Sequence, residues 1–127
     1  MKILVAGGGG REHAICLALT KNANVELYSV MGKKNPGIAK IALDTFIHTE
    51  TDVPAVLKFA KEHNIQYAVV GPEAPLEAGL VDALTKEGIG CVGPVKAAAR
   101  IETDKGFCRG LMNKYGIDGC PAYKLCK

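Results

Sequence analysis

The feature that most constrains the fold is a short apolar run that stops at four consecutive glycines and leads into a helical pattern. Lys2–Ala6 is rich in branched apolar residues, which is typical of a buried strand, and glycines follow at once at positions 7–10. Across residues 11–21 the apolar side chains recur at the i, i+1, i+4 and i+5 spacing of one helical face. A strand, a glycine turn and a helix in this order predict the first part of a βαβ unit and therefore a parallel sheet.

The rest of the chain alternates between strand and helix patterns in the same way. Further strands are predicted over residues 25–30, 45–48, 65–70 and 89–92, and further helices over residues 54–63, 76–87, 96–101 and 105–115. Because strands separated by helices favour right-handed crossovers, the predicted fold class is α/β, with a doubly wound, mainly parallel sheet.

Several local features add detail to this pattern. Asp52 is expected to cap the helix that follows it, and residues 31–40 are predicted to form a loop because glycine and Asn-Pro-Gly interrupt them. The pair Val69-Val70 is expected to lie at the centre of the sheet, buried on both faces. Residues 121–127 look like the beginning of another strand, so we expect the chain to be a fragment of a longer protein.

Composition excludes several classes of protein. A chain of 127 residues without a long apolar run or a signal-peptide pattern predicts one soluble unit with no membrane partner. The net charge of +3 comes from basic residues scattered along the chain, which does not favour a nucleic-acid partner. The five cysteines have irregular spacings, contain no C-x-x-C pair and share no ligand spacing with the three histidines. They therefore predict reduced thiols, a cytoplasmic location and no metal held by this chain alone.

The glycine turn after the first strand is a candidate phosphate site. Glycines allow a ligand to approach the backbone, the following helix offers free N–H groups, and Arg11 adds a planar donor. A tight turn needs glycine for structural reasons as well. The dinucleotide fingerprint fits poorly, because Glu12 occupies the position of its third glycine and no acidic residue ends the second strand. An NAD(P)-binding domain and a stand-alone phosphate-binding module are the alternatives.

A second candidate loop follows the strand over residues 65–70. It reads Gly-Pro-Glu-Ala-Pro-Leu, and its two prolines make it stiff around Glu73. Because both loops follow parallel strands, they open at the same edge of the sheet. We expect the phosphate of a ribose 5-phosphate compound at residues 8–11, with its sugar pointing toward Glu73, although a solvated glutamate is the simpler explanation. Asn35 and Gly37, which follow the second strand, would line the same crevice.

Three motifs occur in order at fitting intervals: GGGREH at positions 8–13, VGPEAPL at positions 70–76 and GPVKAAA at positions 93–99. Together they closely resemble the amino-terminal domain of the phosphoribosylamine–glycine ligase family, also called glycinamide ribonucleotide synthetases, within the ATP-grasp superfamily. The resemblance covers nearly the whole chain. One departure lies in the loop after the second strand, which usually reads Pro-Gly-Asn in the family, whereas Asn35 here precedes Pro36 and Gly37.

The resemblance implies an ADP-forming carbon–nitrogen ligase of purine biosynthesis, which joins glycine to 5-phosphoribosylamine. ATP phosphorylates the glycine carboxylate, with Mg²⁺ or Mn²⁺ present, and the substrate amine then attacks the glycyl phosphate. The resemblance places Lys105 near the ATP phosphates and assigns no catalytic or metal-ligating residue. The substrate-binding residues that the motifs and the loop chemistry together suggest are Gly8, Gly9, Gly10, Arg11, Glu12, His13, Asn35, Gly37, Gly71, Glu73 and Pro75.

The family enzyme is several times longer than this chain, which implies that different parts of the enzyme bind the substrate and catalyse the reaction. Residues 1–95 are expected to form a Rossmann-like substrate-binding domain, and residues 96–127 the connecting helices and the start of the ATP-grasp region. The remaining ATP-grasp domains would be partners within the same enzyme. We therefore expect this chain alone to bind the phosphoribosyl substrate without catalysis and without a bound cofactor, since phosphoryl transfer depends on metal-assisted charge stabilisation.

Overall fold

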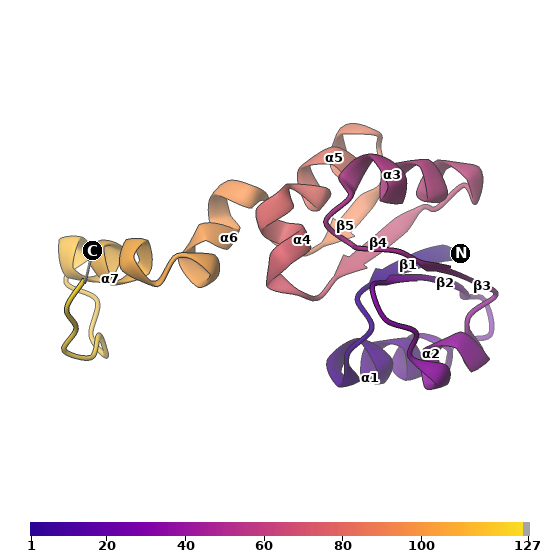
Figure 1. Cartoon of the computed structure of the whole chain (residues 1–127), viewed down its shortest axis with the longest axis horizontal. Coiled ribbons are helices and arrows are strands. Elements are labelled where there is room, and N and C mark those ends of the chain that lie inside the picture. The colour runs from indigo at the N-terminus through magenta and orange to yellow at the C-terminus, as the bar shows by residue number, and fades with distance from the viewer. Residues whose placement is uncertain (126–127) are drawn as a thin grey trace.

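A computed structural model describes residues 1–125 and shows a five-stranded parallel sheet with helices on both faces (Figure 1). Because β1 lies at the centre of the sheet, its backbone pairs with β2 on one side and with β4 on the other. The predicted doubly wound α/β fold is therefore confirmed. The strands, in the spatial order β3-β2-β1-β4-β5, are β1 (Lys2–Ala6), β2 (Glu26–Met31), β3 (Asp44–Ile47), β4 (Tyr67–Val70) and β5 (Gly90–Val92).

The helices form two layers and an arm. In Figure 1, α1 and α2 lie on one face of the sheet, α3, α4 and α5 lie on the other, and α6 and α7 extend away from it. Within the arm, α6 packs against α4 and α7 packs against α6. The helices are α1 (Gly10–Leu19), α2 (Pro36–Ile41), α3 (Val53–Glu62), α4 (Glu73–Ala78), α5 (Leu80–Lys86), α6 (Lys96–Thr103) and α7 (Lys105–Tyr115).

The core has two parts because side chains alternate between the two faces of each strand. Leu4 and Val30 face the larger cluster beneath α3 and α5, whereas Val5 faces the smaller cluster beneath α1 and α2. Val69 faces that smaller cluster too, but it is only half-buried, which contradicts the prediction of full burial. The reason is that α1 packs over β1 and α2 over β2, so β4 is thinly covered on this face. Val70, on the other face, is buried as expected.

Three further predictions about local structure need correction. Residues 31–40 are not only a loop, because Asn35 caps the short helix α2 by accepting hydrogen bonds from the N–H groups of Gly37 (2.9 Å) and Ile38 (3.3 Å). The single helix predicted over residues 76–87 is two helices, α4 and α5, separated by Gly79 at φ +88°. Residues 121–125 form no strand, and the last two residues of that prediction lie outside the described part of the chain.

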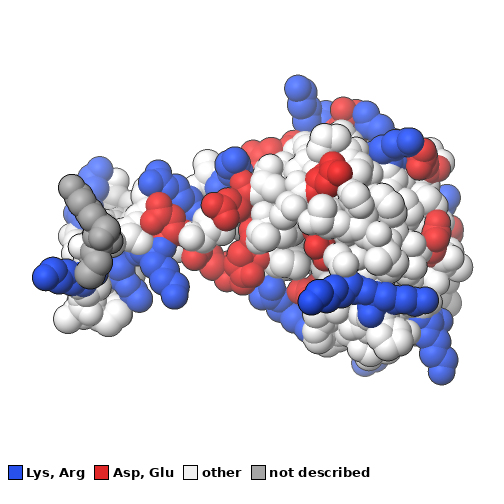
Figure 2. Space-filling model, viewed as in Figure 1, with Lys and Arg blue, Asp and Glu red and all other residues white. Residues whose placement is uncertain are grey.

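The predicted Asp52 cap is in place, and Asp104 caps a later helix in the same way. The Asp52 carboxylate accepts a hydrogen bond from the Ala55 N–H (3.2 Å) at the start of α3, and Asp104 accepts one from the Phe107 N–H (2.8 Å) at the start of α7. Among residues 1–125, no helix combines the length and the apolar character that a membrane crossing requires. Basic and acidic side chains are interspersed over the face of the molecule displayed in Figure 2.

Candidate functional site

The loops that follow β1, β2 and β4 meet at the carboxyl edge of the sheet. The central position of β1 brings its glycine turn between the loop after β2 and the loop after β4. All of the predicted substrate-binding residues lie on these three loops or on the first turns of the helices that follow them. In a parallel sheet, ligands bind at this edge. The structure therefore assembles a candidate site from segments that are far apart in the sequence.

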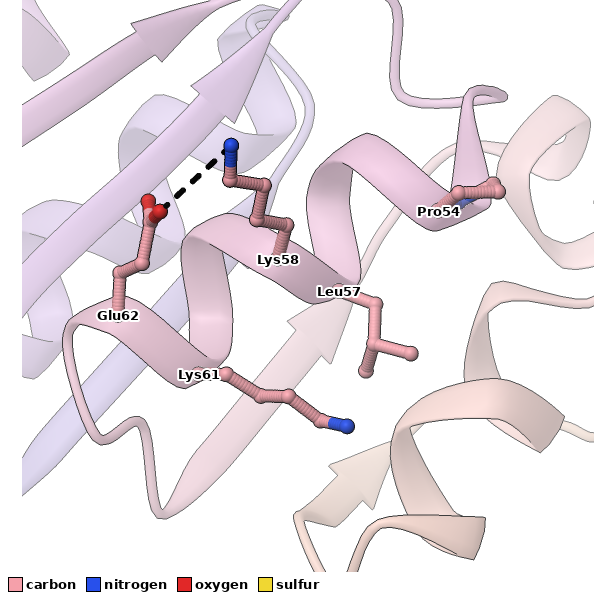
Figure 3. Close-up of a pocket in the computed structure, with 5 residues that line it drawn as sticks. All are labelled: Pro54, Leu57, Lys58, Lys61 and Glu62. Atoms are coloured by element: carbon pink, nitrogen blue, oxygen red, sulfur yellow. Dashed lines mark ion pairs between the residues drawn. The ribbon is translucent and has the colours of Figure 1, made fainter.

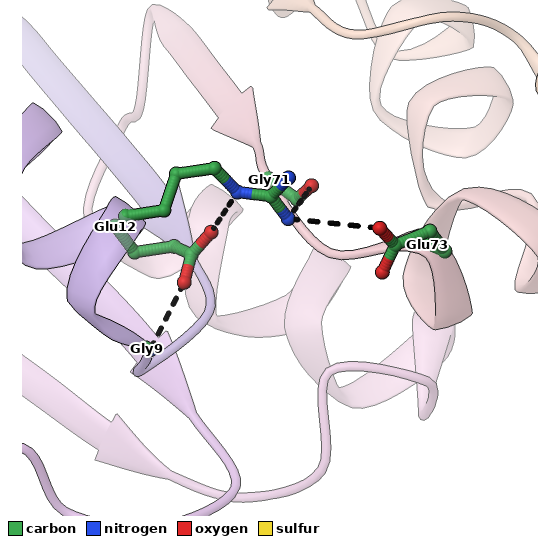
Figure 4. Close-up of polar contacts among 5 residues, drawn as sticks. Gly9, Glu12, Gly71 and Glu73 are labelled. Atoms are coloured by element: carbon green, nitrogen blue, oxygen red, sulfur yellow. Dashed lines mark hydrogen bonds and ion pairs between the residues drawn. The ribbon is translucent and has the colours of Figure 1, made fainter. Parts of the chain in front are cut away.

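Glu12 is the buried centre of this edge. Its side chain is only 5% exposed; one carboxylate oxygen accepts a hydrogen bond from the Gly9 N–H (3.0 Å) and the other from Arg11 Nε (3.0 Å) (Figure 4). Gly71 packs so closely on Glu12 that a Cβ atom there would overlap its carboxylate, and a Cβ at Gly7 would lie 2.7 Å from the Glu12 Cγ. Glu12 therefore occupies the space between the loops that follow β1 and β4.

Arg11 connects the same two loops. Its Nη2 donates a hydrogen bond to the Gly71 carbonyl (2.7 Å) and lies 3.9 Å from Glu73 Oε1. The hydrogen bond to Glu12, together with the Glu12 charge, raises the pKa of the Arg11 guanidinium above its usual value. Glu73 begins α4 with its side chain 51% exposed, so its carboxylate remains accessible from solvent. The Arg11 side chain is exposed too (58%), but it donates hydrogen bonds within the protein, whereas Glu73 meets it only at ion-pair distance.

The loop after β2 supports the glycine turn from the other side. The Asn35 amide donates a hydrogen bond to the Gly8 carbonyl (3.0 Å), while its oxygen caps α2. The His13 ring fills the space that a Cβ atom at Gly37 would need. Pro75 is fully buried in α4. In this structure Asn35, His13 and Pro75 hold the loops in place.

A cleft of about 570 Å³ opens beside the glycine turn. Glu50 accepts a hydrogen bond from the Gly32 N–H (2.8 Å) and closes one side of it. The sequence analysis did not select Glu50 or Lys33, although Glu50 follows β3 much as Glu73 follows β4, a signal that could have found it. The residues that line the cleft are Gly8, Gly9, Gly32, Lys33, Thr49 and Glu50.

Two other features lie away from this edge. A hollow of about 350 Å³ runs along α3 beside Leu57, where Lys58 and Glu62 form an ion pair (3.9 Å); it contains no predicted site residue (Figure 3). Lys105, predicted from the resemblance to approach ATP phosphates, is exposed at the start of α7. Because α7 extends away from the sheet, the structure does not bring Lys105 together with the other predicted residues (Figure 1).

The thiols and the possible metal ligands are dispersed. Cys16 is buried between α1 and the sheet, and this burial raises the pKa of its thiol to about 11, so it is a poor nucleophile at neutral pH. Burial also raises the pKa of Cys91. Within residues 1–125, no three His, Cys, Asp or Glu side chains gather in a way that could hold a metal ion.

Comparison with known proteins gives a consistent result. Residues 1–102 match the family described as phosphoribosylglycinamide synthetase, N domain. The phosphoribosylamine–glycine ligase of Methanocorpusculum labreanum is 95% identical over 99% of this chain, and that of Methanoregula boonei is 54% identical over 98% of it. The chain spans 29% of the length of each of these relatives.

Solved structures share the fold at low sequence identity. N5-carboxyaminoimidazole ribonucleotide synthetase from Thermotoga maritima superposes with a TM-score of 0.73 at 20% identity, covering 99% of this chain and 33% of that one. Phosphoribosylglycinamide synthetase from Anaerococcus prevotii gives a TM-score of 0.70 at 18% identity, covering 91% of this chain and 29% of that one. By its family match and its sequence relatives, the chain belongs to the phosphoribosylglycinamide synthetase family and corresponds to its N domain.

Proposed function

We propose that this chain is the substrate-binding part of an ADP-forming phosphoribosylamine–glycine ligase of purine biosynthesis. In the complete enzyme, the amine of 5-phosphoribosylamine attacks the carbonyl carbon of a glycyl phosphate, an amide bond forms and inorganic phosphate leaves. The family match and the curated relatives support this activity, whereas nothing comparable favours an NAD(P)-binding domain or a stand-alone phosphate-binding module. The task of this chain is then to bind and orient the sugar that carries the nucleophilic amine.

This proposal rests on the observation that the glycine turn and Glu73 lie at the same edge of the sheet, the carboxyl edge. Arg11 bonds to the Gly71 carbonyl and so fixes the loop that bears Glu73 relative to the turn. The exposed Glu73 carboxylate can accept hydrogen bonds from sugar hydroxyls or from an amine. The turn lets a sugar approach the backbone closely, since Gly8, Gly9 and Gly10 carry no side chains.

The other predicted residues have supporting parts in this proposal. Glu12 and Asn35 hold the turn through their hydrogen bonds to Gly9 and Gly8. His13 rests on Gly37, and Pro75 anchors the first turn of α4 in the core. The proposed substrate site thus combines a few residues open to the ligand with a larger set that fixes their geometry.

The cofactors belong to the complete enzyme in this proposal. ATP supplies the phosphoryl group that activates glycine, and Mg²⁺ or Mn²⁺ neutralises the phosphates. Residues 1–125 contain no cluster suited to a metal ion, so we assign the metal to the part of the relatives that this chain does not span. Lys105 would meet ATP phosphates from the arm. We further propose that residues 1–95 bind the substrate, that residues 96–127 lead into the ATP-grasp region, and that the enzyme is cytoplasmic.

Calorimetry with ribose 5-phosphate tests the proposed site. Glu73→Ala should weaken binding roughly tenfold or more, because it removes a charged hydrogen-bond acceptor. Glu77→Ala is the matched control, since Glu77 is exposed on the same helix and carries the same charge. Wild-type protein that does not bind ribose 5-phosphate, or equal weakening by both substitutions, would overturn the proposal.

A turnover assay tests the proposal that this chain binds the substrate but does not catalyse the reaction alone. The chain is mixed with ATP, Mg²⁺, glycine and freshly prepared phosphoribosylamine, and ADP release is followed. We expect no glycine-dependent ADP release above a control without protein. Such release would show that the described residues suffice for phosphoryl transfer and that the proposed assignment of the metal site is wrong.

A further inference from the structure

The buried Glu12 changes what the glycine turn can bind. In a dinucleotide-binding turn, the N–H groups face phosphates and a third glycine lets the helix pack closely. Here Glu12 occupies the position of that glycine, and its carboxylate turns back to accept the Gly9 N–H (3.0 Å) (Figure 4). One N–H group that would otherwise meet a phosphate is therefore already bonded to an anion.

The charges around the turn reinforce this effect. The Glu12 carboxylate is buried, so its charge is weakly screened by solvent. Arg11 already contacts the Glu12 carboxylate, the Gly71 carbonyl and, at 3.9 Å, the Glu73 carboxylate. Lys33 lines the cleft beside the turn together with the Glu50 carboxylate. A phosphate at the turn would thus face the carboxylates of Glu12 and Glu73, which share the Arg11 guanidinium, and on the cleft side Lys33 beside the Glu50 carboxylate. An uncharged hydroxyl or a cationic amine would meet no such repulsion.

We propose that Glu12 is a specificity-determining residue that closes the glycine turn to phosphate and pyrophosphate groups. This selects against dinucleotides even though the strand, turn and helix have the dinucleotide-binding arrangement. Given the proposed function, on which this step rests, the sugar and amine of phosphoribosylamine face the turn and Glu73, and the phosphate points away. This orientation is the reverse of the one that we expected from the sequence, in which the phosphate lay at residues 8–11.

Glu12→Gln separates the charge of this residue from its capping role. Glutamine at the third helical position accepts the same N–H as glutamate, so the helix start is retained. The substitution removes the buried charge and places an amide donor opposite Arg11 Nε, which releases the guanidinium. Glu26→Gln is the matched control, because Glu26 is exposed at the start of β2, at the opposite edge of the sheet.

The test is a pyrophosphate titration of the full chain, followed through the backbone amide resonances of residues 8–11. We expect no perturbation in the wild type or in Glu26→Gln at a pyrophosphate concentration that perturbs these resonances in Glu12→Gln, and none in the wild type at a concentration roughly tenfold higher. Glu12→Gly, which restores the third glycine, replaces Glu12→Gln if the latter does not fold. Perturbation of the turn in the wild type, or its absence in the folded variant, would overturn the inference. Ribose 5-phosphate binding by the wild type, measured separately, reports on the proposed function alone.

Discussion

The carboxyl edge of the sheet and the α6–α7 arm are stabilised by different kinds of contact. At the edge, contacts join loops that are distant in sequence, as where Arg11 reaches Gly71 and Asn35 reaches Gly8. In the arm, the bonds are mostly local: Asp104 caps α7 and pairs with Arg100 four residues earlier. No residue of α7 is buried. The edge is therefore held by the tertiary fold, and so is α6, which packs against α4 and buries Ala99 in the core, whereas α7 depends on its cap and on neighbouring residues.

This difference predicts that the edge is rigid enough to preorganise a ligand and that α7 opens independently of the sheet. Regions with few buried apolar contacts unfold locally at low free energy. Substitutions in the edge or in the central strands should consequently affect the whole domain. Equivalent substitutions in α7 should affect α7 alone.

The largest expected effect is that of Val5→Asp. Val5 is fully buried in the central strand, so an unpaired carboxylate there should lower the free energy of unfolding by about 4 kcal/mol or more. Leu111→Asp in α7 makes the same kind of change at a half-buried position and should cost about 1 kcal/mol or less. Urea denaturation followed by circular dichroism measures both. If the two variants lost similar amounts of unfolding free energy, the proposed difference between the central sheet and α7 would be wrong.

A pair of glycine substitutions should act in opposite directions. Gly71→Ala should destabilise the domain by about 1–3 kcal/mol, because the new Cβ overlaps the buried Glu12 carboxylate. Gly110→Ala lies in the exposed interior of α7 with open space around it, and should stabilise that helix by about 0.5–1 kcal/mol. Denaturation for the first variant and amide hydrogen exchange in α7 for the second check these values. An unchanged free energy of unfolding in Gly71→Ala would mean that the carboxyl edge accommodates the new Cβ without strain.

The smallest expected effect is a dependence of the arm on pH. The Phe107 N–H that donates to Asp104, followed by the Arg100 side chain, lowers the pKa of that carboxyl in the folded state. The unfolded chain therefore takes up the proton first, so the cap is fully stabilising above about pH 4 and is lost as the pH falls through the lower folded-state pKa. The Cα chemical shifts of residues 105–108 should lose helical character below pH 4. Asp104→Asn should largely remove this dependence, and an unchanged titration in that variant would contradict the assignment.

The sequence predicted well those features that depend on local pattern. The strand Lys2–Ala6, its glycine turn and the Asp52 cap required only neighbouring residues. The helix α2 was missed because six residues show little periodicity, and the break at Gly79 depends on a left-handed backbone that composition does not reveal.

The candidate site was predicted in outline but not in its details. Both loops at the carboxyl edge were expected, because parallel strands open in one direction. The burial of Glu12 was not, since glutamate is normally exposed and its cover comes from Gly71 on a distant loop. Lys33 and Glu50 line the cleft because β3 pairs with β2, and that pairing is a property of the strand order.

We propose that the carboxyl edge binds the sugar substrate and that the arm takes no part in this binding. A titration of the chain with ribose 5-phosphate, followed by amide chemical shifts, tests it most directly. We expect perturbations at residues 8–13 and 71–73, with the resonances of α7 unchanged. Perturbations confined to α6 and α7, or none at saturating ligand, would contradict it.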